Sequence, residues 1–202
     1  KCLKAFLSRC FNRGWIAHKF WDDVKVRVDT PVKEGATDRE IHKLLSMLDL
    51  TDFVQLRDAV AALTMYQTGL RVGTVVQLTN DNVDLAERMF RIGGELVKNH
   101  ESLLLPFDDV LARLLGVLMK QNDKVRRRHI VRNNLLFITM YGGPIATSPT
   151  NNNIIKRLNK YAREFGIKNI NPHALRRGFA MNLRKKGADI TLISKALGHS
   201  DL

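Results

Sequence analysis

The sequence predicts a mainly α-helical protein with a small antiparallel β-sheet, an α+β fold. Apolar residues recur at helical spacing in several stretches, and capping residues precede many of them. Only short runs, chiefly Met89–Ile92 and Leu103–Leu105, have the composition of strands, and no internal repeat is visible. Because 45% of the 202 residues are hydrophobic, the chain can bury a core, which excludes a disordered tail.

The amino-terminal part begins with a basic amphipathic stretch. Residues Lys1–Arg13 are expected to form one helix, which Gly14 ends. The apolar side of this helix would consist of Leu3, Phe6, Leu7 and Phe11. Proline, glycine and charged residues follow at 29–36, and we interpret this segment as a linker.

Helix signals dominate the stretch after the linker. Thr37 and Glu40 have the spacing of a capping box, which predicts the start of a helix. The buried face of this helix would be Ile41, Leu44, Leu45 and Leu48. The next segment, Asp52–Tyr66, is rich in alanine, valine and leucine and is predicted to be the central core helix. Gly69 interrupts it, and a short helix is expected at Val72–Leu78.

The two strand-like runs predict a β-hairpin with a polar connection at residues 93–102 and Lys98 at its tip. Pro106 would end the second strand. The signals that follow are a helix at Asp108–Met119, a basic run at 124–129, a third short strand at Leu135–Ile138, and a helix at Asn152–Glu164. Between the last two lies a loop rich in turn residues.

The C-terminal stretch has the clearest helix signals. Asn171 can cap a helix, Pro172 suits its first position, and Gly187 would end it. Its apolar stripe would be Leu175, Phe179 and Leu183. Asp189 can cap a second helix that would run to Gly198.

The charge balance points to a polyanionic partner. The chain has 33 Lys and Arg against 20 Asp and Glu, a formal net charge of +13. This excess is typical of nucleic-acid binding proteins, although ribosomal and membrane-surface proteins share it. Cys2 and Cys10 lie about 12 Å apart along one predicted helix, too far for a disulfide. The sequence has no C-x-x-C pair, signal peptide or long apolar run, so we expect a soluble protein without a structural zinc site or membrane span.

Five side chains could take part in chemistry, although each also has an ordinary structural explanation. They are Arg71, Lys98, His173, Arg176 and His199. An arginine at a helix start can bind an anion or simply lie on the surface. A loop lysine is usually solvated, and His100 competes with Lys98 as the functional residue of the hairpin. His173 and Arg176, three residues apart, could be a surface pair, and His199 could interact with the end of a helix.

The order of these residues resembles the motifs of the tyrosine recombinases, the phage-integrase family. The motifs are GLR at 69–71, a hairpin lysine ahead of a strand that ends in proline, H-x-x-R at 173–176 and L-G-H at 197–199. The resemblance covers roughly Ala36–Leu202. It implies a catalytic domain at 37–202, preceded at 1–28 by the end of an amino-terminal helical domain that binds the core DNA site.

The resemblance also implies roles for the five residues. Arg71 and Arg176 would bind the phosphate through paired donors and stabilise the charge that develops during phosphoryl transfer. Lys98 would protonate the leaving 5′-oxygen. His173 and His199 would donate hydrogen bonds to the phosphate or handle the proton of the nucleophile. No metal and no other cofactor is implied.

Two features depart from the family pattern. The family usually has an acidic residue three places after the first arginine, where this chain has Thr74. Its nucleophilic tyrosine follows the L-G-H histidine by about nine residues. Tyr66, Tyr141 and Tyr161 all lie upstream, and we interpret them as a core residue, a loop residue and a residue on a helix face. The nucleophile is therefore expected beyond Leu202, in a chain truncated before it.

The resemblance thus predicts an enzyme that cleaves and rejoins double-stranded DNA through a covalent 3′-phosphotyrosine, acting as a tetramer on paired sites. It would work in the cytoplasm of a prokaryote or of the host cell of a phage or mobile element, and residues 1–202 alone would be inactive. Two alternatives remain at this stage. One is strand breakage and rejoining of the type IB topoisomerase kind, and the other is a DNA-binding module that has lost its activity.

Overall fold

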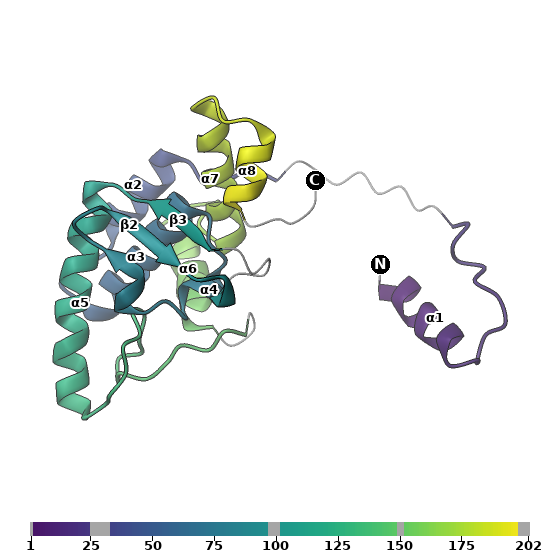
Figure 1. Ribbon diagram of the computed structural model, residues 1–202, viewed down its shortest axis with the longest axis horizontal. Helices are drawn as coiled ribbons and strands as arrows, with labels where there is room; N and C mark the ends of the chain where they lie inside the picture. Colours follow the sequence, from purple (N-terminus) through teal and green to yellow (C-terminus); the bar gives the residue numbers. More distant parts are fainter. Residues whose placement is uncertain (1, 25–32, 97–101, 149–151, 198–202) are drawn as a thin grey trace. The chain divides into compact units, whose positions relative to one another are not determined.

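The computed structural model describes residues 2–24, 33–96, 102–148 and 152–197. The chain divides into two compact units, Lys1–Val32 and Lys33–Leu202, here called unit 1 and unit 2. The mainly helical fold with a small antiparallel sheet is confirmed, and nearly all of it belongs to unit 2 (Figure 1).

Unit 1 consists of helix α1 (Cys2–Asn12) and the short segment after it. The chain leaves the helix at Gly14, which adopts a φ of 73°. Trp21 is buried, and its ring makes edge contacts with Phe11 and Phe20 at centroid distances of 6.4 and 5.2 Å. The sequence prediction for this helix was correct to within one residue at each end.

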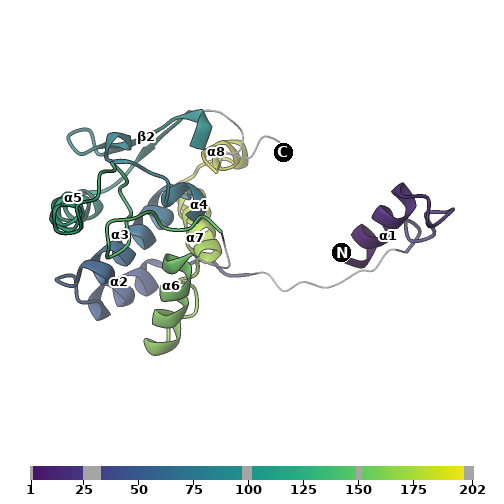
Figure 2. The ribbon, with the colours of Figure 1, turned by 90° about the horizontal axis from the view of Figure 1, so that it is seen from below.

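Unit 2 is built around helix α3 (Phe53–Thr68), most of whose residues are buried. Seen from below, α3 lies between α5 on one side and α6 and α7 on the other (Figure 2). The surrounding helices are α2 (Asp38–Met47), α5 (Asp109–His129), α6 (Asn153–Glu164) and α7 (Pro172–Lys185). Two short helices, α4 (Val72–Val75) and α8 (Ile190–Ala196), follow α3 and α7.

Side chains at the predicted caps fix the starts of these helices. The Thr37 hydroxyl accepts from the Glu40 N–H at 3.3 Å, and the Glu40 carboxylate accepts from the Thr37 N–H at 3.0 Å. Asp52 and Asn171 cap α3 and α7 by accepting backbone N–H groups three residues later. Because these bonds are local, the sequence predicted the caps at Thr37 and Asn171 correctly. The cap at Asp52 was not predicted.

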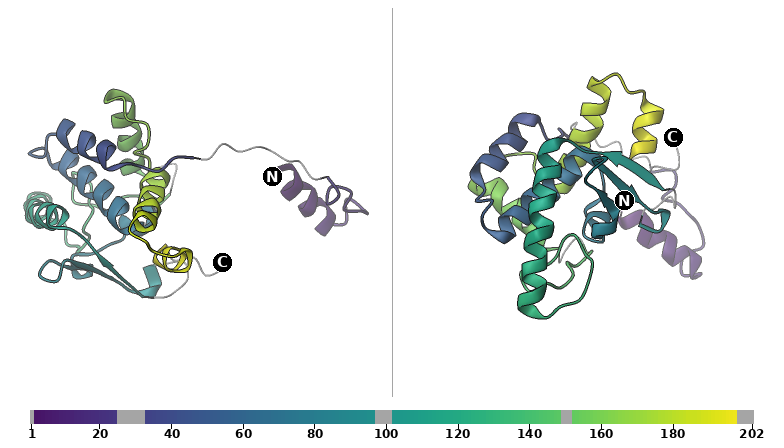
Figure 3. Two further views of the ribbon diagram at one scale, coloured as in Figure 1. Left: turned by 90° about the horizontal axis from the view of Figure 1, so that it is seen from above. Right: turned by 60° about the vertical axis from the view of Figure 1, so that its left-hand side comes forward.

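The sheet has the strand order β1 (Val83–Asp84), β2 (Met89–Ile92), β3 (Leu103–Pro106), and both pairings are antiparallel. In the β2–β3 hairpin Phe90 pairs with Leu105, and both side chains are buried against the core. The 3-10 turn η2 (Gly94–Leu96) follows β2, and β3 leads directly into α5 (Figure 3). The predicted hairpin is confirmed; its tip lies outside the described residues.

Three predictions about the secondary structure of unit 2 were wrong. Leu135–Ile138 does not form the third strand, since Leu135 and Ile138 make only isolated bridges, to Thr79 and Pro144. The helix expected at Asp108–Met119 continues to His129, so the basic run forms its last turns. The short helix expected at Val72–Leu78 ends at Val75. Among the described helices, none has both the length and the apolar composition needed to cross a bilayer.

Candidate active site

The site is built where α3 ends. Gly69 terminates this helix in the left-handed conformation, with φ of 69°, and its N–H donates to the Met65 carbonyl at 2.9 Å. A Cβ at this position would overlap the ring of Phe179 on α7. Only glycine satisfies both conditions, and the sharp turn that results delivers Arg71 to the start of α4.

Arg71 is the N-cap residue of α4, and its side chain is exposed. Its carbonyl closes the turn by accepting from the N–H groups of Thr74 and Val75, both at 2.9 Å. Across residues 33–96, 102–148 and 152–197, no hydrogen bond or ion pair engages its guanidinium. The charge is therefore available to a ligand.

Arg176 approaches the same place from α7. Its half-buried guanidinium donates through Nη1 to the Gly69 carbonyl and through Nη2 to the Leu197 carbonyl at 2.5 Å. These bonds connect the end of α3 to the end of α8 and fix the orientation of the guanidinium. His173 lies one turn earlier on the same helix with its side chain exposed.

The position of Arg176 affects its protonation. Burial lowers the pKa of Arg176 to about 10, and the positive charge of nearby Arg71 lowers that pKa as well. Arg176 is still protonated at neutral pH, so two positive charges are held near one another. An anion bound there would relieve both the repulsion and part of the desolvation. The arrangement is suited to a phosphate.

Thr74 lies on the turn that follows Arg71 but does not interact with its side chain. It is buried, and its Oγ1 donates to the carbonyl of Leu96 in η2 at 3.0 Å. The hydroxyl therefore ties α4 to the end of the β2 arm of the hairpin.

The phage integrase family model matches residues 36–202, most of the chain. The chain belongs to the phage integrase family. The tyrosine recombinase XerD of Listeria innocua is 28% identical over 206 residues, which cover 99% of this chain and 66% of that protein. The XerD of Lacticaseibacillus casei is 31% identical over 186 residues, covering 89% and 61%. The chain thus spans about two thirds of the length of these relatives.

Solved structures share the fold. The Tn1549 transposon integrase in complex with a circular intermediate DNA superposes with a TM-score of 0.72 at 19% identity, covering 98% of this chain and 69% of that one. The XerA recombinase gives a TM-score of 0.65 at 22% identity, covering 88% and 58%. The XerH recombinase bound to its difH substrate gives 0.64 at 21%, covering 89% and 50%.

In this phage-integrase chain three of the five predicted site residues lie in the described part, namely Arg71, His173 and Arg176. The charge of Arg71 acts on Arg176 near the end of α3, and His173 lies on the same helix as Arg176. Lys98 and His199 lie outside the described residues, so the predictions made for them stay predictions. No group of three or more His, Cys, Asp or Glu side chains in the described part could hold a metal ion.

Two of the three tyrosines are buried. The Tyr66 hydroxyl donates to Asp38 at 2.7 Å and accepts from Asn182 at 2.8 Å, and burial raises its pKa to about 12. Tyr161 is also buried, with a pKa raised to about 12 by burial and by the charge of Asp58. Tyr161 lies on a face of helix α6, as the sequence indicated, and this face is buried. Tyr141 is 64% exposed, and its ring lies against that of His129.

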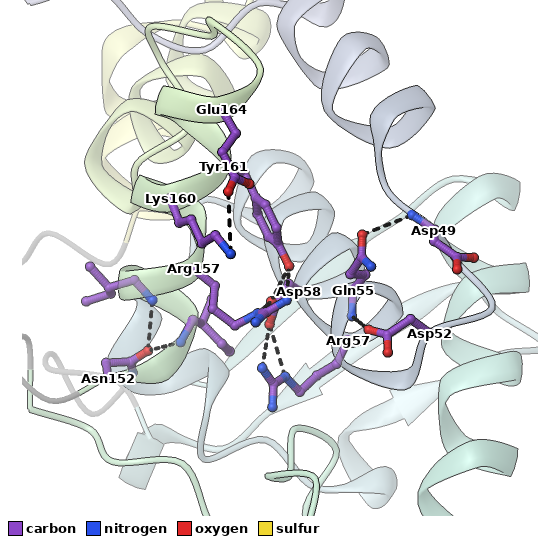
Figure 4. Close-up of polar contacts among 12 residues, drawn as sticks. Asp49, Asp52, Gln55, Arg57, Asp58, Asn152, Arg157, Lys160, Tyr161 and Glu164 are labelled. Atoms are coloured by element: carbon purple, nitrogen blue, oxygen red, sulfur yellow. Dashed lines mark hydrogen bonds and ion pairs between the residues drawn. The ribbon is translucent and has the colours of Figure 1, made fainter.

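A buried ionic network was missed by the sequence analysis (Figure 4). Asp58, fully buried in α3, accepts from Arg57 at 2.6 Å, from the Tyr161 hydroxyl at 3.0 Å and from Arg157. Arg57 also donates to the Ile138 carbonyl at 3.1 Å. The Arg57–Asp58 pair inside an apolar helix could have indicated a buried ionic network. Its partners could not be predicted, because Arg157 and Tyr161 lie about a hundred residues further along the chain.

Proposed function

We propose that this protein is a site-specific tyrosine recombinase, which cleaves and rejoins DNA strands through a covalent 3′-phosphotyrosine. The observation that carries this proposal is the pair of guanidiniums at the end of α3, where the Arg176 donors are held by the Gly69 and Leu197 carbonyls and the charge of Arg71 lies nearby. Two positive charges held close together are suited to bind an anion. The family membership supports a DNA phosphodiester as that anion.

The chemistry requires positioned positive charge. In-line attack on a phosphodiester builds negative charge on the non-bridging oxygens, and preorganised donors stabilise that charge without reorganising. Arg71 and Arg176 would provide the donors, since a guanidinium presents a planar fork and stays charged at any working pH. The bonds of Arg176 to the Gly69 and Leu197 carbonyls support this role, because they hold the fork in one orientation.

The remaining residues are assigned by position in the motifs. Lys98 would protonate the leaving 5′-oxygen, a role that an ammonium on a hairpin tip can fill. His173 and His199 would donate hydrogen bonds to the phosphate or accept the proton of the nucleophile. The exposure of His173 beside Arg176 supports its part in this assignment.

The nucleophile is proposed to be none of the three tyrosines in residues 1–202. Burial and a hydrogen bond to a carboxylate make Tyr66 and Tyr161 poor nucleophiles, because their pKa values are raised to about 12. Tyr141 is exposed, and its ring lies against His129 in the last turn of α5. We propose that the tyrosine lies after Leu202 and that residues 1–202 alone bind DNA without becoming joined to it.

Double-stranded DNA is the proposed partner, bound by a tetramer on paired sites. In this scheme residues 37–202 form the catalytic domain, 29–36 the linker, and 1–28 the end of a second DNA-binding domain. The net charge of +13 supports a salt-driven interaction. If about 6–10 phosphates are contacted, affinity should fall roughly 10³- to 10⁵-fold between 50 and 200 mM salt. Affinity that is nearly independent of salt would contradict this.

A nicked suicide substrate tests the function. The cleaved end diffuses away from such a substrate, which traps the covalent intermediate for denaturing electrophoresis. The protein extended along its natural sequence past Leu202 should form an adduct, and the 202-residue chain should not. Mixing the short chain with a full-length partner controls for a tyrosine supplied by a neighbouring protomer. An adduct on Tyr66, Tyr141 or Tyr161 would overturn the assignment of the nucleophile.

A further inference from the structure

We infer that Leu197 is a positioning residue for the guanidinium of Arg176. The Leu197 side chain packs the end of α8 on the turn at Gly69, and the Leu197 carbonyl then accepts a hydrogen bond from Arg176. The effect on DNA cleavage rests on the proposed function, whereas the orientation of the guanidinium does not.

Few contacts hold α8 in place. The helix has seven residues, Ile190–Ala196, and none of them is buried. Ile190 and Leu192 are 74% and 53% exposed. A helix this short is not stable by itself in water, so tertiary contacts must fix it. In the part of the chain that the structure describes, the bond from Arg176 to Leu197 is the only hydrogen bond that joins α8 and its C-cap to α3 or α7.

The Leu197 side chain reaches the turn that ends α3. Gly69 has no side chain, and the space that its Cβ would occupy is lined by the ring of Phe179 and a methyl group of Leu197. Leu197 Cδ2 lies 3.0 Å from the position of that Cβ. Phe179 belongs to α7 and is itself only 8% exposed. The glycine therefore lets Leu197 pack against both α3 and α7, and this packing fixes the end of α8.

Both carbonyls that hold Arg176 belong to this packed group. Arg176 donates through Nη1 to the Gly69 carbonyl and through Nη2 to the Leu197 carbonyl at 2.5 Å. Because two different nitrogens of a planar group are engaged, the guanidinium has one orientation. Without the Leu197 side chain the end of α8 is free to move, and the second carbonyl moves with it. The guanidinium then turns about the one bond that is left.

The orientation matters because a guanidinium binds a phosphate best through two parallel N–H groups, which requires the plane of the group to be aimed at the anion. A misplacement of about 1 Å at a reacting centre can lower a rate about 100-fold. Leu197 would thus influence cleavage through Arg176, without supplying a polar side chain of its own.

The first test reads the guanidinium directly, by nuclear magnetic resonance of the arginine side chains in the 202-residue chain. Arg176→Lys identifies the Arg176 signals by their loss. Leu197→Ala removes the packing but keeps the carbonyl, and Leu197→Met restores an apolar side chain of similar volume. Leu192→Ala is the matched control, because it shortens an exposed leucine of the same helix.

In wild type the two Nη groups of Arg176 should give separate signals, since bonds to two carbonyls slow rotation about the Cζ–Nε bond. These signals should merge in Leu197→Ala and stay separate in Leu197→Met and Leu192→Ala. Circular dichroism should show the wild-type helix content in all three variants, because α8 contributes no buried residue to the core.

The second test measures cleavage of the suicide substrate by the protein that carries its nucleophile. Leu197→Ala should cleave about 10- to 100-fold more slowly than wild type. Leu197→Met and Leu192→Ala should stay within about threefold of wild type. DNA affinity should change little in any variant, because the positive charges are all retained.

Merged Arg176 signals in wild type, or separate signals in Leu197→Ala, would overturn the positioning role of Leu197. Equal effects of Leu197→Ala and Leu192→Ala would do the same, since they would reflect damage to α8 in general. Signals that merge without slower cleavage would show that the orientation of Arg176 does not matter for the reaction, which also overturns the role. The proposed function fails separately, if wild type forms no adduct, and the resonance test then still decides whether Leu197 orients Arg176.

Discussion

Two pairs of arginines in unit 2 are held in opposite ways. Arg57 and Arg157 share the carboxylate of Asp58, which is fully buried and also accepts from the Tyr161 hydroxyl. Arg71 and Arg176 lie near one another at the end of α3, where the charge of Arg71 lowers the pKa of Arg176. The first pair surrounds its anion within the protein, whereas Arg176 of the second pair donates to the carbonyls of Gly69 and Leu197.

The difference shows how one side-chain type serves stability in one place and ligand binding in another. The Asp58 network joins α3 to α6 and, through Arg57, to the carbonyl of Ile138, which forms a bridge with Pro144. Its interactions therefore stabilise the folded chain. Keeping Arg176 charged while half-buried is unfavourable in the free protein, which is why its pKa falls to about 10. In the proposed function a bound phosphate would offset this cost, so folding would prepare the site for the anion.

Removing the shared carboxylate should give the largest effect on stability. Asp58→Ala leaves two arginines around an empty place in the core, and the free energy of unfolding should fall by about 3–5 kcal/mol. Urea denaturation followed by circular dichroism measures this loss. Arg71→Ala is the matched control, because its exposed side chain should change stability by less than about 0.5 kcal/mol. A stable Asp58→Ala variant would mean that the network is not a major support of the core.

The Asp58 network illustrates which contacts could not be predicted from the sequence, namely those between residues far apart in the chain. Helix starts at Thr37 and Asn171 were predictable because the cap and its partner are three residues apart. The true end of α5 was missed because Asn122 and Arg126 interrupt its apolar period. Both are nevertheless buried, with side chains that donate to the Leu136 and Leu135 carbonyls.

The residues of the candidate site show the same difference between local patterns and contacts made by the tertiary fold. The motifs predicted Arg71, His173 and Arg176, because each follows a local turn or helix start. No local pattern could show that Thr74 binds Leu96, since the two meet only through the tertiary fold. For the same reason Leu135–Ile138 was misinterpreted as a strand: its apolar run fits any buried segment, and the pairing with Thr79 is confined to one bridge.

The second largest effect should appear in catalysis. Arg176→Lys keeps the charge but loses the planar fork, so cleavage of the suicide substrate should fall about 10²- to 10³-fold. DNA affinity should fall much less, since the charge remains. Arg177→Lys is a neighbouring control, because that arginine donates to the Glu34 carbonyl on a different side of α7. Equal loss in both variants would indicate damage to the helix and not to the phosphate site.

A smaller effect should come from an inorganic anion. Sulfate at about ten times its dissociation constant should stabilise the wild-type protein by about 1.4 kcal/mol. Arg71→Gln should lose most of this gain, because one of the two charges is gone. Sulfate also stabilises proteins in general by exclusion from the surface, so the comparison is made at equal salt with the exposed Arg113→Gln as control. Identical stabilisation of all three proteins by sulfate would show that the arginine pair binds no anion.

The smallest effect should be seen at alkaline pH, where the two buried tyrosines and Arg176 act in opposite directions. Tyr66 and Tyr161 have pKa values raised to about 12, above the usual 10, so the unfolded chain releases these protons first. Their contribution to stability is complete below pH 10 and is lost as the pH rises to about 12. Arg176 has a pKa lowered to about 10, so the unfolded chain holds that proton more tightly, and its contribution to stability rises as the pH increases above 10.

The two contributions can be separated by substitution, with unfolding measured in urea from pH 9 to pH 11.5. Tyr66→Phe cannot ionise, so the alkaline loss should become shallower even though the hydrogen bond to Asp38 is removed at every pH. Arg176→Met should make the loss of stability with rising pH steeper, because the opposing contribution of Arg176 is removed. Tyr141→Phe, at an exposed position, should leave the profile unchanged. A Tyr66→Phe profile parallel to that of wild type would mean that burial does not hold this phenol protonated.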